Sequence, residues 1–93
     1  IQKRVVFIGT LNQSLVHPRE VFADAIGDRA AGVICVHNHP SGNIQPSRED
    51  IAVTKKLVEA GKIIGIRIMD HVIIGKTSYF SFQAEGLLNN GEY

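Results

Sequence analysis

The sequence predicts an α/β domain of mixed α+β type, in which a mixed sheet is flanked by helices. Apolar, strand-like runs alternate with two stretches of helical periodicity, in the order strand, helix, strand, helix and then further strands. The chain has 93 residues, of which 44% are hydrophobic and 20% are charged. That length and composition suit one domain with a single core, so we expect residues 1–93 to form one domain.

The first half of the chain is expected to contain a strand, a helix and a second strand. The apolar run at residues 4–8 predicts a strand that is buried on both faces. Residues 10–14 are rich in turn formers, and Pro18 suits the first position of a helix. Residues 33–36 are again apolar and predict the second strand. The stripe of the helix that should face the sheet consists of Val21, Phe22, Ala25 and Ile26.

A second helix is predicted over about residues 48–60, with Gly61 as its C-terminal stop. Ser47 and Asp50 have the spacing of a helix capping box. On this interpretation Ser47 caps the helix, and Asp50 lies in the first turn, where it complements the helix dipole. Taken alone, the spacing favours capping. The apolar side of this helix is expected to contain Ile51, Thr54, Leu57 and Val58.

The last third of the chain is expected to be mostly strand. Residues 63–69 and 72–74 are rich in β-branched side chains, which are typical of strands. Residues 75–78 have the composition of a turn, so residues 79–82 are predicted to return as a hairpin partner. The tail at residues 85–93 is rich in Gly and Asn, and we expect it to be loose.

Two histidines follow the second predicted strand and suggest a metal site. His37 and His39 are separated by one residue, so on an extended segment their side chains point to the same face. They lie at the C-terminal end of a strand, where α/β folds usually bind their ligands. The alternative is a solvated pair of polar residues at a strand end. Two histidines in this position favour the metal.

Asp50 is the candidate third ligand. A catalytic zinc site usually has three protein ligands and one open position. The loop at residues 40–46 contains turn-forming Gly, Asn and Pro residues, so it can bring the start of the second helix back toward the histidines. Two imidazoles and one carboxylate suit zinc better than copper or an iron–sulfur cluster. Asp50 can serve as both a capping-box residue and a ligand.

At these motifs the chain resembles the RadC family of bacterial proteins, which belongs to the JAMM (MPN+, JAB1/MPN) metalloprotease superfamily. The resemblance covers nearly the whole chain. The segments that carry it are residues 37–42 (His-Asn-His-Pro-Ser-Gly), 46–50 (Pro-Ser-Arg-Glu-Asp), 70–75 (Asp-His-Val-Ile-Ile-Gly), 9–12 and 16–20. It implies the MPN fold, which is similar to that of cytidine deaminases. Their His-x-Glu and Cys-x-x-Cys signature is absent here, so deamination is excluded.

The resemblance also implies roles for particular residues. His37, His39 and Asp50 match the superfamily's zinc ligands, which gives one Zn²⁺ per chain. Ser47 matches a serine that helps to hold the water or the developing oxyanion. The superfamily uses a glutamate on an early strand as general base, but no acidic residue stands in residues 2–9. Three interpretations stay open: the base lies upstream of residue 1, Glu20 takes its role, or peptidase activity has been lost. The chain begins at Ile1 without an initiator Met, so we expect a fragment of a longer protein.

The function that follows is hydrolysis of peptide or isopeptide bonds by a zinc-activated water, with a protein or peptide as substrate. The alternative is a noncatalytic metal-binding MPN module that serves protein interaction in DNA metabolism, since RadC proteins carry a DNA repair label. The formal net charge is +1, the Lys and Arg residues are scattered and aromatic residues are few. This domain alone therefore does not suit nucleic-acid binding. The sequence specifies neither the substrate nor the oligomeric state.

Other candidate residues have structural interpretations. Cys35 is the only cysteine and shares a strand face with His37, but a cysteine within an apolar strand is usually a core residue. His17, which precedes Pro18, is also expected to be structural. For Asp70 and His71 two roles stay open: orienting a metal ligand, or shaping a bend between strands.

The cysteine count and the lengths of the apolar runs indicate the cellular compartment in which we expect the protein. A single cysteine allows no intramolecular disulfide. No apolar run approaches the ~18 residues that a membrane helix needs, and no signal-peptide pattern is present. We expect a cytoplasmic bacterial protein that has no membrane partner.

Overall fold

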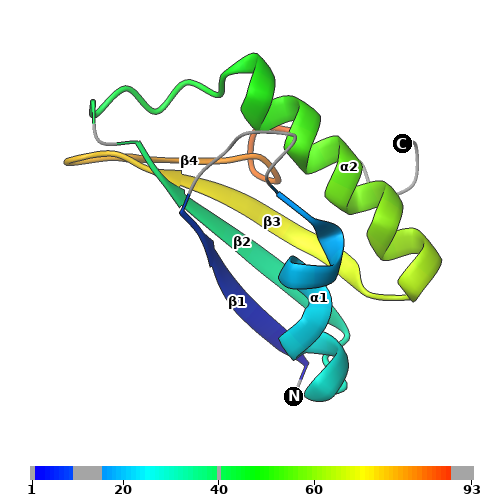
Figure 1. The fold of residues 1–93 in the computed structure, drawn as a ribbon. Helices are drawn as coiled ribbons and strands as arrows, with labels where there is room; N and C mark the ends of the chain where they lie inside the picture. Colours follow the sequence, from blue (N-terminus) through cyan, green and yellow to red (C-terminus); the bar gives the residue numbers. More distant parts are fainter. Residues whose placement is uncertain (1, 10–15, 40, 89–93) are drawn as a thin grey trace.

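The computed structural model describes residues 2–9, 16–39 and 41–88, which form a four-stranded sheet and two helices (Figure 1). The order of the strands in the sheet is β1-β2-β3-β4. The first three strands are parallel, and β4 pairs antiparallel with β3. The predicted mixed sheet of an α/β fold is therefore confirmed. The elements are β1 (Lys3–Ile8), α1 (Pro18–Gly27), β2 (Gly32–Asn38), α2 (Arg48–Ile64), β3 (Arg67–Ile74) and β4 (Tyr79–Ser81).

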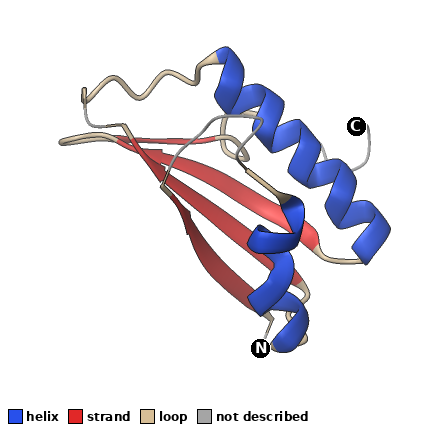
Figure 2. Ribbon diagram, viewed as in Figure 1, coloured by secondary structure: helices blue, strands red, loops and turns tan. Residues whose placement is uncertain are grey.

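Both helices pack on the same face of the sheet (Figures 1 and 2). The connections β1-α1-β2 and β2-α2-β3 each move one strand along the sheet in the same direction. Right-handed crossovers of this kind place consecutive helices on one side. The core lies between this face and the helices. Its largest fully buried apolar side chains are Phe22, Phe82, Leu57, Ile68, Ile73, Val33, Val53 and Val58.

The other face of the sheet is uncovered in the described part of the chain. On β1 the side chains alternate, with Ile8 buried, whereas Val5 and Phe7 are 47% and 77% exposed. The prediction that this strand is buried on both faces is therefore wrong. A continuous apolar run indicates burial on both faces only where a second layer covers the sheet, and both described helices lie on one side.

The end of α2 also differs from the prediction. The helix continues past Gly61 to Ile64, and Gly65 takes the left-handed conformation, with φ of 87°, that caps it. Gly61 has a packing role instead, because a Cβ atom there would lie 2.3 Å from the carbonyl oxygen of Ile66. Ile63 therefore belongs to the helix, not to the predicted strand, and is 89% exposed.

The helix stripes were predicted correctly in part. Val21, Phe22 and Ala25 are buried on α1, and Thr54, Leu57 and Val58 are buried on α2. Ile26 and Ile51, in contrast, are 54% and 47% exposed. On α2 the buried positions include Val53 and Asp50, and Asp50 is only 1% exposed. The sheet-facing stripe of α2 thus begins with a carboxylate.

The C-terminal part of the fold is a hairpin followed by a turn. The predicted turn is confirmed, and it is closed by a 2.8 Å hydrogen bond from the Gly75 N–H to the Ser78 carbonyl. In the tail that we expected to be loose, Leu88 packs against the core, whereas residues 89–93 lie outside the described residues. Residues 10–14 and Pro40, both expected in turns, lie outside them as well. Neither described helix is long and apolar enough to cross a membrane.

Candidate metal centre

Three side chains from two segments of the chain come together where β2 ends and α2 begins. β2 carries His37 and leads into His39, and the first turn of α2 carries Asp50. One possible ligand atom from each residue lies within 4.8 Å of the other two. The rings of His37 and His39 stand edge to face, with centroids 4.9 Å apart. The structure therefore places the three predicted ligands in one group.

The ring of His37 is held by the neighbouring strand. Its Nδ1 atom lies 3.1 Å from the carbonyl oxygen of Ile8, the last residue of β1. A carbonyl only accepts, so Nδ1 carries the proton and donates it. The Nε2 atom then keeps a lone pair in the neutral ring. His37 is 9% exposed, so a buried histidine with a fixed tautomer presents one nitrogen as a ligand.

His39 is held in the same way by the loop that follows it. Its Nδ1 atom donates to the carbonyl oxygen of Asn43 over 2.7 Å. Its Nε2 atom lies 3.2 Å from Oδ2 of Asp50. The His39 backbone N–H also bonds to the carbonyl oxygen of Ile74 at the end of β3, over 2.9 Å. Both rings therefore carry a proton on Nδ1, and in the neutral form of each ring Nε2 is the nitrogen that can bind a metal.

The carboxylate of Asp50 is positioned by the helix cap. Its Oδ2 atom accepts a 2.6 Å hydrogen bond from the Ser47 N–H, while the Ser47 Oγ atom accepts one of 3.1 Å from the Asp50 N–H. These two bonds are the predicted capping box, which is confirmed. Ser47 is exposed at the mouth of the group. Capping and ligation are compatible, because a carboxylate has more lone pairs than the cap uses.

The group fits a divalent metal in chemistry and in size. Zinc bonds of about 2.1 Å in tetrahedral geometry place neighbouring ligand atoms roughly 3.4 Å apart. The distance of 3.2 Å between Nε2 of His39 and Oδ2 of Asp50 already meets this requirement. The widest separation, at most 4.8 Å, would need to close by up to about 1.4 Å, which side-chain rotation supplies. Two neutral imidazoles and a carboxylate are a donor set that zinc accepts.

The turn between β3 and β4 supports the loop that joins the histidines to Asp50. A Cβ atom on Gly75 would lie 2.7 Å from Cγ2 of Ile44 and 2.9 Å from the carbonyl oxygen of Gly42. Gly42 has a φ of 86° and packs near the side chain of Lys76. The backbone of this turn therefore touches the backbone of the loop, and only a glycine at position 75 allows that approach.

Comparison with known proteins identifies the family. A family model described as a RadC-like JAB domain matches residues 1–87. The chain belongs to this family. The similarity that was inferred from the sequence motifs is therefore confirmed, and it brings the chain into the JAMM/MPN superfamily. JAB domains usually bind a metal, so the group formed by His37, His39 and Asp50 is the candidate metal site of this JAB domain.

The chain is also similar to bacterial proteins named UPF0758. It is 58% identical over 86 residues to one from Bacillus cereus (strain B4264) and 60% identical over 86 residues to one from Geobacillus thermodenitrificans (strain NG80-2). A UPF0758 protein of Geobacillus kaustophilus (strain HTA426) is likewise 60% identical. Each match covers 92% of this chain but only 38% of the relative. The JAB domain described here thus spans less than half of the length of these relatives.

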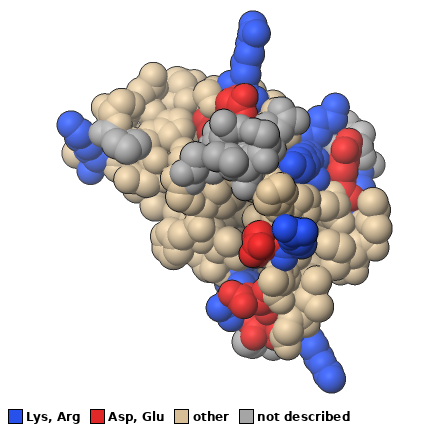
Figure 3. Space-filling model, in the orientation of Figure 1, with Lys and Arg blue, Asp and Glu red and all other residues tan. Residues whose placement is uncertain are grey.

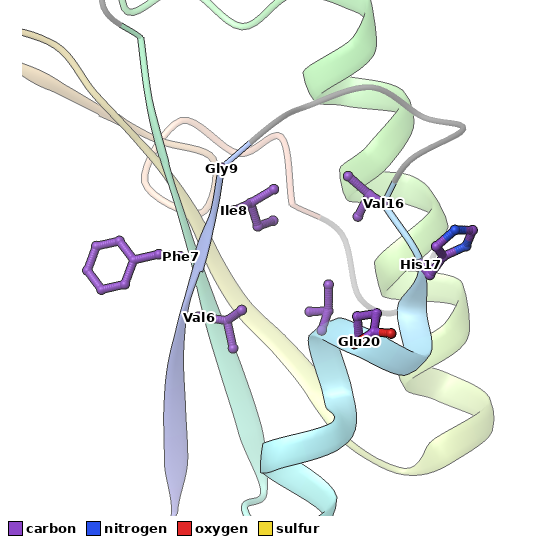
Figure 4. Close-up of a pocket in the computed structure, with 8 residues that line it drawn as sticks. Val6, Phe7, Ile8, Gly9, Val16, His17 and Glu20 are labelled. Carbon is purple, nitrogen blue, oxygen red and sulfur yellow. The ribbon is translucent and has the colours of Figure 1, made fainter.

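Glu20, the candidate base within this JAB domain, lies outside the group formed by His37, His39 and Asp50. It lines a cavity of about 390 Å³ between the end of β1 and the start of α1, together with Val6, Ile8 and His17 (Figure 4). Its side chain is 74% exposed, and its charged contact is with Arg19, over 3.9 Å. The structure does not bring Glu20 into the group with His37, His39 and Asp50, so its role as base stays a prediction.

Cys35 lies on the same face of β2 as His37 and is 1% exposed. Burial, reinforced by the charge of Asp70, raises the pKa of its thiol to about 12. In the metal-free chain the thiol therefore stays protonated near neutral pH, which is the wrong form for a nucleophile. Its predicted role in the core fits both observations.

Asp70 and His71 lie within one continuous strand, β3, not at a bend between two strands. Asp70 accepts hydrogen bonds from the Ser81 hydroxyl (2.6 Å) and the Gln83 N–H (3.0 Å), so it supports the turn after β4. The ring of His71 is 1% exposed and stacks on Phe82 at 4.8 Å. Burial lowers the pKa of His71 to about 4, against the opposing charges of Asp50 and Asp70. Its ring is therefore neutral.

Sequence reasoning did not find the groups that fix the two imidazoles. They are the backbone carbonyls of Ile8 and Asn43, which any residue type would supply. A signal was present for one further contact: Thr54 stands four residues after Asp50, one helical turn along the same face of α2. Its hydroxyl reaches both the Asp50 carbonyl and the ring of His71.

Proposed function

We propose that this domain is the zinc-binding unit of a JAMM-type hydrolase, with one Zn²⁺ held by His37, His39 and Asp50. The observation that carries the proposal is the matched state of the two imidazoles. Each donates its Nδ1 proton to a backbone carbonyl, so that both keep an Nε2 lone pair beside one buried carboxylate. Backbone carbonyls that orient ligating histidines in this manner are a common feature of zinc sites.

The reaction proposed is hydrolysis of an amide bond in a peptide or an isopeptide linkage. Zinc, when bound, supplies Lewis acidity that polarises a carbonyl and makes a water molecule more acidic. The chain itself supplies Ser47, which is exposed at the start of α2 next to Asp50. The Ser47 Oγ atom accepts the Asp50 N–H, which leaves its own proton to donate to a substrate oxygen that gains negative charge.

Hydrolysis requires a group that accepts a proton from the attacking water as a base and then donates it to the leaving amine, and the identity of that group is the open part of the proposal. Asp50 is the only carboxylate in the described group, and its Oδ2 atom already accepts the hydrogen bond of the cap. Glu20 would have to reach the substrate from an exposed position on α1. If the protein is longer than this chain, as its relatives are, a carboxylate outside residues 1–93 is the other source. Metal binding and turnover should therefore be measured separately.

The first test is metal content by mass spectrometry on untagged protein after zinc has been offered and the excess removed. We expect about one zinc per chain in the wild type and none in His37→Ala. His17→Ala is the matched control, because His17 lies in the cavity beside α1, away from the ligand group, and it should keep its zinc. A wild-type chain without zinc would refute the proposal. Zinc uptake would justify a peptidase screen on the full-length protein.

A noncatalytic metal-binding module that serves protein interaction in DNA metabolism is the second candidate. It is favoured by the position of Glu20, which is exposed and outside the group. Direct contact with nucleic acid is less well supported, because Lys and Arg alternate with Asp and Glu over the face in Figure 3. A zinc-loaded full-length protein that cleaves no peptide or isopeptide substrate would favour this candidate. Salt-dependent binding of DNA to the domain would require the charge argument to be revised.

A further inference from the structure

The ring of His71 is the most unusual buried group outside the ligand set. It comes from β3 and is 1% exposed, and its Nε2 atom has no hydrogen-bond partner among the described residues. The parallel face of Phe82, at 4.8 Å and an interplanar angle of 12°, holds the plane of the ring. A buried polar atom without a partner costs free energy, so a reason for a histidine at this position is required.

An irregularity in the sheet turns this ring toward the helices. Between β2 and β3 the register shifts, so that Val33 pairs with Ile68 whereas Ile34 pairs with Asp70. Met69 is thereby the extra residue of a bulge. Without it the alternation of side chains would turn Asp70 to the helix face and His71 to the open face. The bulge places His71 beneath α2.

The hydroxyl of Thr54 connects His71 to the first turn of α2. Thr54 Oγ1 donates to the carbonyl oxygen of Asp50 over 2.7 Å and is also hydrogen-bonded to Nδ1 of His71. A hydroxyl has only one proton. Since that proton goes to Asp50, the Nδ1 atom of His71 must be the donor in the second bond. With this assignment the unpartnered Nε2 atom of His71 carries a lone pair and not an N–H. Buried N–H groups without a partner are rarer than buried acceptors without one.

We propose that His71 is a positioning residue of the metal centre, and that its Nδ1–H donates to Thr54, which in turn donates to the Asp50 carbonyl. The two bonds tie the turn that carries one ligand to β3, while the other two ligands are tied to β1 and to the loop after β2. This inference rests on the proposed metal site. It explains why a histidine is buried beside Thr54, one helical turn after Asp50.

The affinity for zinc, measured by competition with a chelator under conditions where every variant is folded, tests the role. His71→Phe keeps a flat ring on Phe82 but loses both nitrogens, and Thr54→Val keeps the shape of the side chain but loses the hydroxyl. We expect each to lower the affinity by about 10- to 100-fold, the usual range for residues that orient ligands. The double variant should lose no more than either single variant, because both remove one relay.

Two amide variants separate positioning from packing. The amide nitrogen of His71→Asn is one bond from Cγ, as Nδ1 is in the imidazole, so this variant should stay within about threefold of the wild-type affinity. The amide of His71→Gln reaches toward the place of Nε2 and should behave like His71→Phe. Equal losses in the Asn and Gln variants, or wild-type affinity in a folded His71→Phe, would overturn the inference.

Nitrogen NMR of the metal-free wild type tests the relay without any substitution. We expect His71 to be neutral, with the proton on Nδ1. A proton on Nε2 would show that Thr54 donates to the ring, and the relay would be wrong. The two proposals fail in different experiments: a wild-type chain that takes up no zinc refutes the metal site, whereas variants that bind as tightly as the wild type refute only the role of His71.

Discussion

Two places in this domain combine a histidine with a carboxylate, and they differ in what surrounds the pair. At the end of β2, His39 lies 3.2 Å from Asp50, and the carboxylate is 1% exposed. At the start of α1, His17 and Glu20 line one cavity, and the side chain of Glu20 is 74% exposed. The first pair is fixed by the Asn43 carbonyl and by the capping box of α2. Among the described residues no hydrogen bond holds the Glu20 carboxylate in this way, and its charged contact with Arg19 is long, at 3.9 Å.

The comparison teaches that the residue types alone do not make a site. Water competes for an exposed carboxylate on a helix, and the side chain keeps most of its rotamers. A carboxylate that accepts a backbone N–H in a buried first turn is already desolvated and already held in one rotamer before a metal binds. The cost of organising such ligands is included in the free energy of folding, which is why we expect metal at the first pair only.

Removing the carboxylate of the organised pair is expected to have the largest effect. Asp50→Asn keeps the shape of the side chain but replaces a charged ligand oxygen with an amide. The affinity for zinc should fall on the order of 1,000-fold, beyond the 10- to 100-fold expected for residues that only orient ligands. Glu20→Gln is the matched control, and its affinity should stay unchanged. Calorimetry or chelator competition measures both variants.

The same experiment can break the comparison. If Asp50→Asn keeps full zinc occupancy while Glu20→Gln loses it, the metal lies at the α1 cavity, and the organised group is only a helix cap. Circular dichroism on both variants must accompany the measurement, because Asp50 also accepts the Ser47 N–H. Asparagine retains an oxygen that can accept this bond, so we expect the Asn variant to fold.

The stability of the metal-free domain should depend on pH through His71, whose pKa is lowered by burial from 6.5 to about 4. The unfolded chain takes up this proton near pH 6.5, and the folded chain only near pH 4. Stability is therefore fully present above about pH 6.5 and is lost as the pH falls toward 4, by at most about 3 kcal/mol. Asp50, Asp70, His37 and His39 also act on the ring.

Urea unfolding of the wild type and His71→Phe in a chelating buffer isolates this contribution, because the other groups titrate in both proteins. We expect the unfolding free energy of the wild type to decrease relative to that of His71→Phe as the pH falls from 6.5 to 4. A difference that stays constant over this range would mean that His71 is protonated in the folded state, or that water reaches its Nε2 atom.

Gly75→Ala tests whether the loop that follows His39 must be held in place. The added Cβ atom would lie 2.9 Å from the Gly42 carbonyl and 2.7 Å from Ile44, so the loop or the turn must move. His39 depends on this loop for its bond to Asn43. We expect the affinity for zinc to fall by about 10-fold, at the low end of the range for orienting groups. Gly27→Ala, at a glycine with open space around it and no left-handed φ, is the control and should bind zinc normally.

Much of the arrangement of His37, His39 and Asp50 could be predicted from the sequence, because it depends on local geometry. The spacing of His37 and His39 places both on one face of a strand, and the capping-box spacing places Asp50 in the first turn of a helix. These rules act over two to four residues. They hold whatever the rest of the chain does. The structure brings the three candidate ligands together in space, and their role as metal ligands stays a prediction.

What the sequence did not reveal depends on contacts between distant segments. The Ile8 carbonyl that holds His37 comes from 29 residues away. Phe7 was predicted to be buried, and it is exposed because both helices lie on the opposite face. Gly61 was predicted to end the helix, but a glycine is required there because the backbone of Ile66 approaches it closely. That approach cannot be read from the local sequence. Backbone partners and tertiary approaches of this kind have no local residue pattern.

The smallest effect is expected at Cys35, which is close to the metal group in the fold but chemically apart from it. It stands two residues before His37 on the same face of β2 and is 1% exposed. Burial raises its pKa to about 12, so the thiol is protonated at neutral pH in the metal-free chain. Cys35→Ala should cost about 1 kcal/mol of stability through the lost sulfur contacts, while the affinity for zinc stays within about twofold of wild type. A folded Cys35→Ala that loses its zinc would make the thiol a ligand. The contrast between the His39–Asp50 pair and the His17–Glu20 pair would then no longer explain where the metal binds. A side chain that no hydrogen bond among the described residues holds in place would have become a ligand.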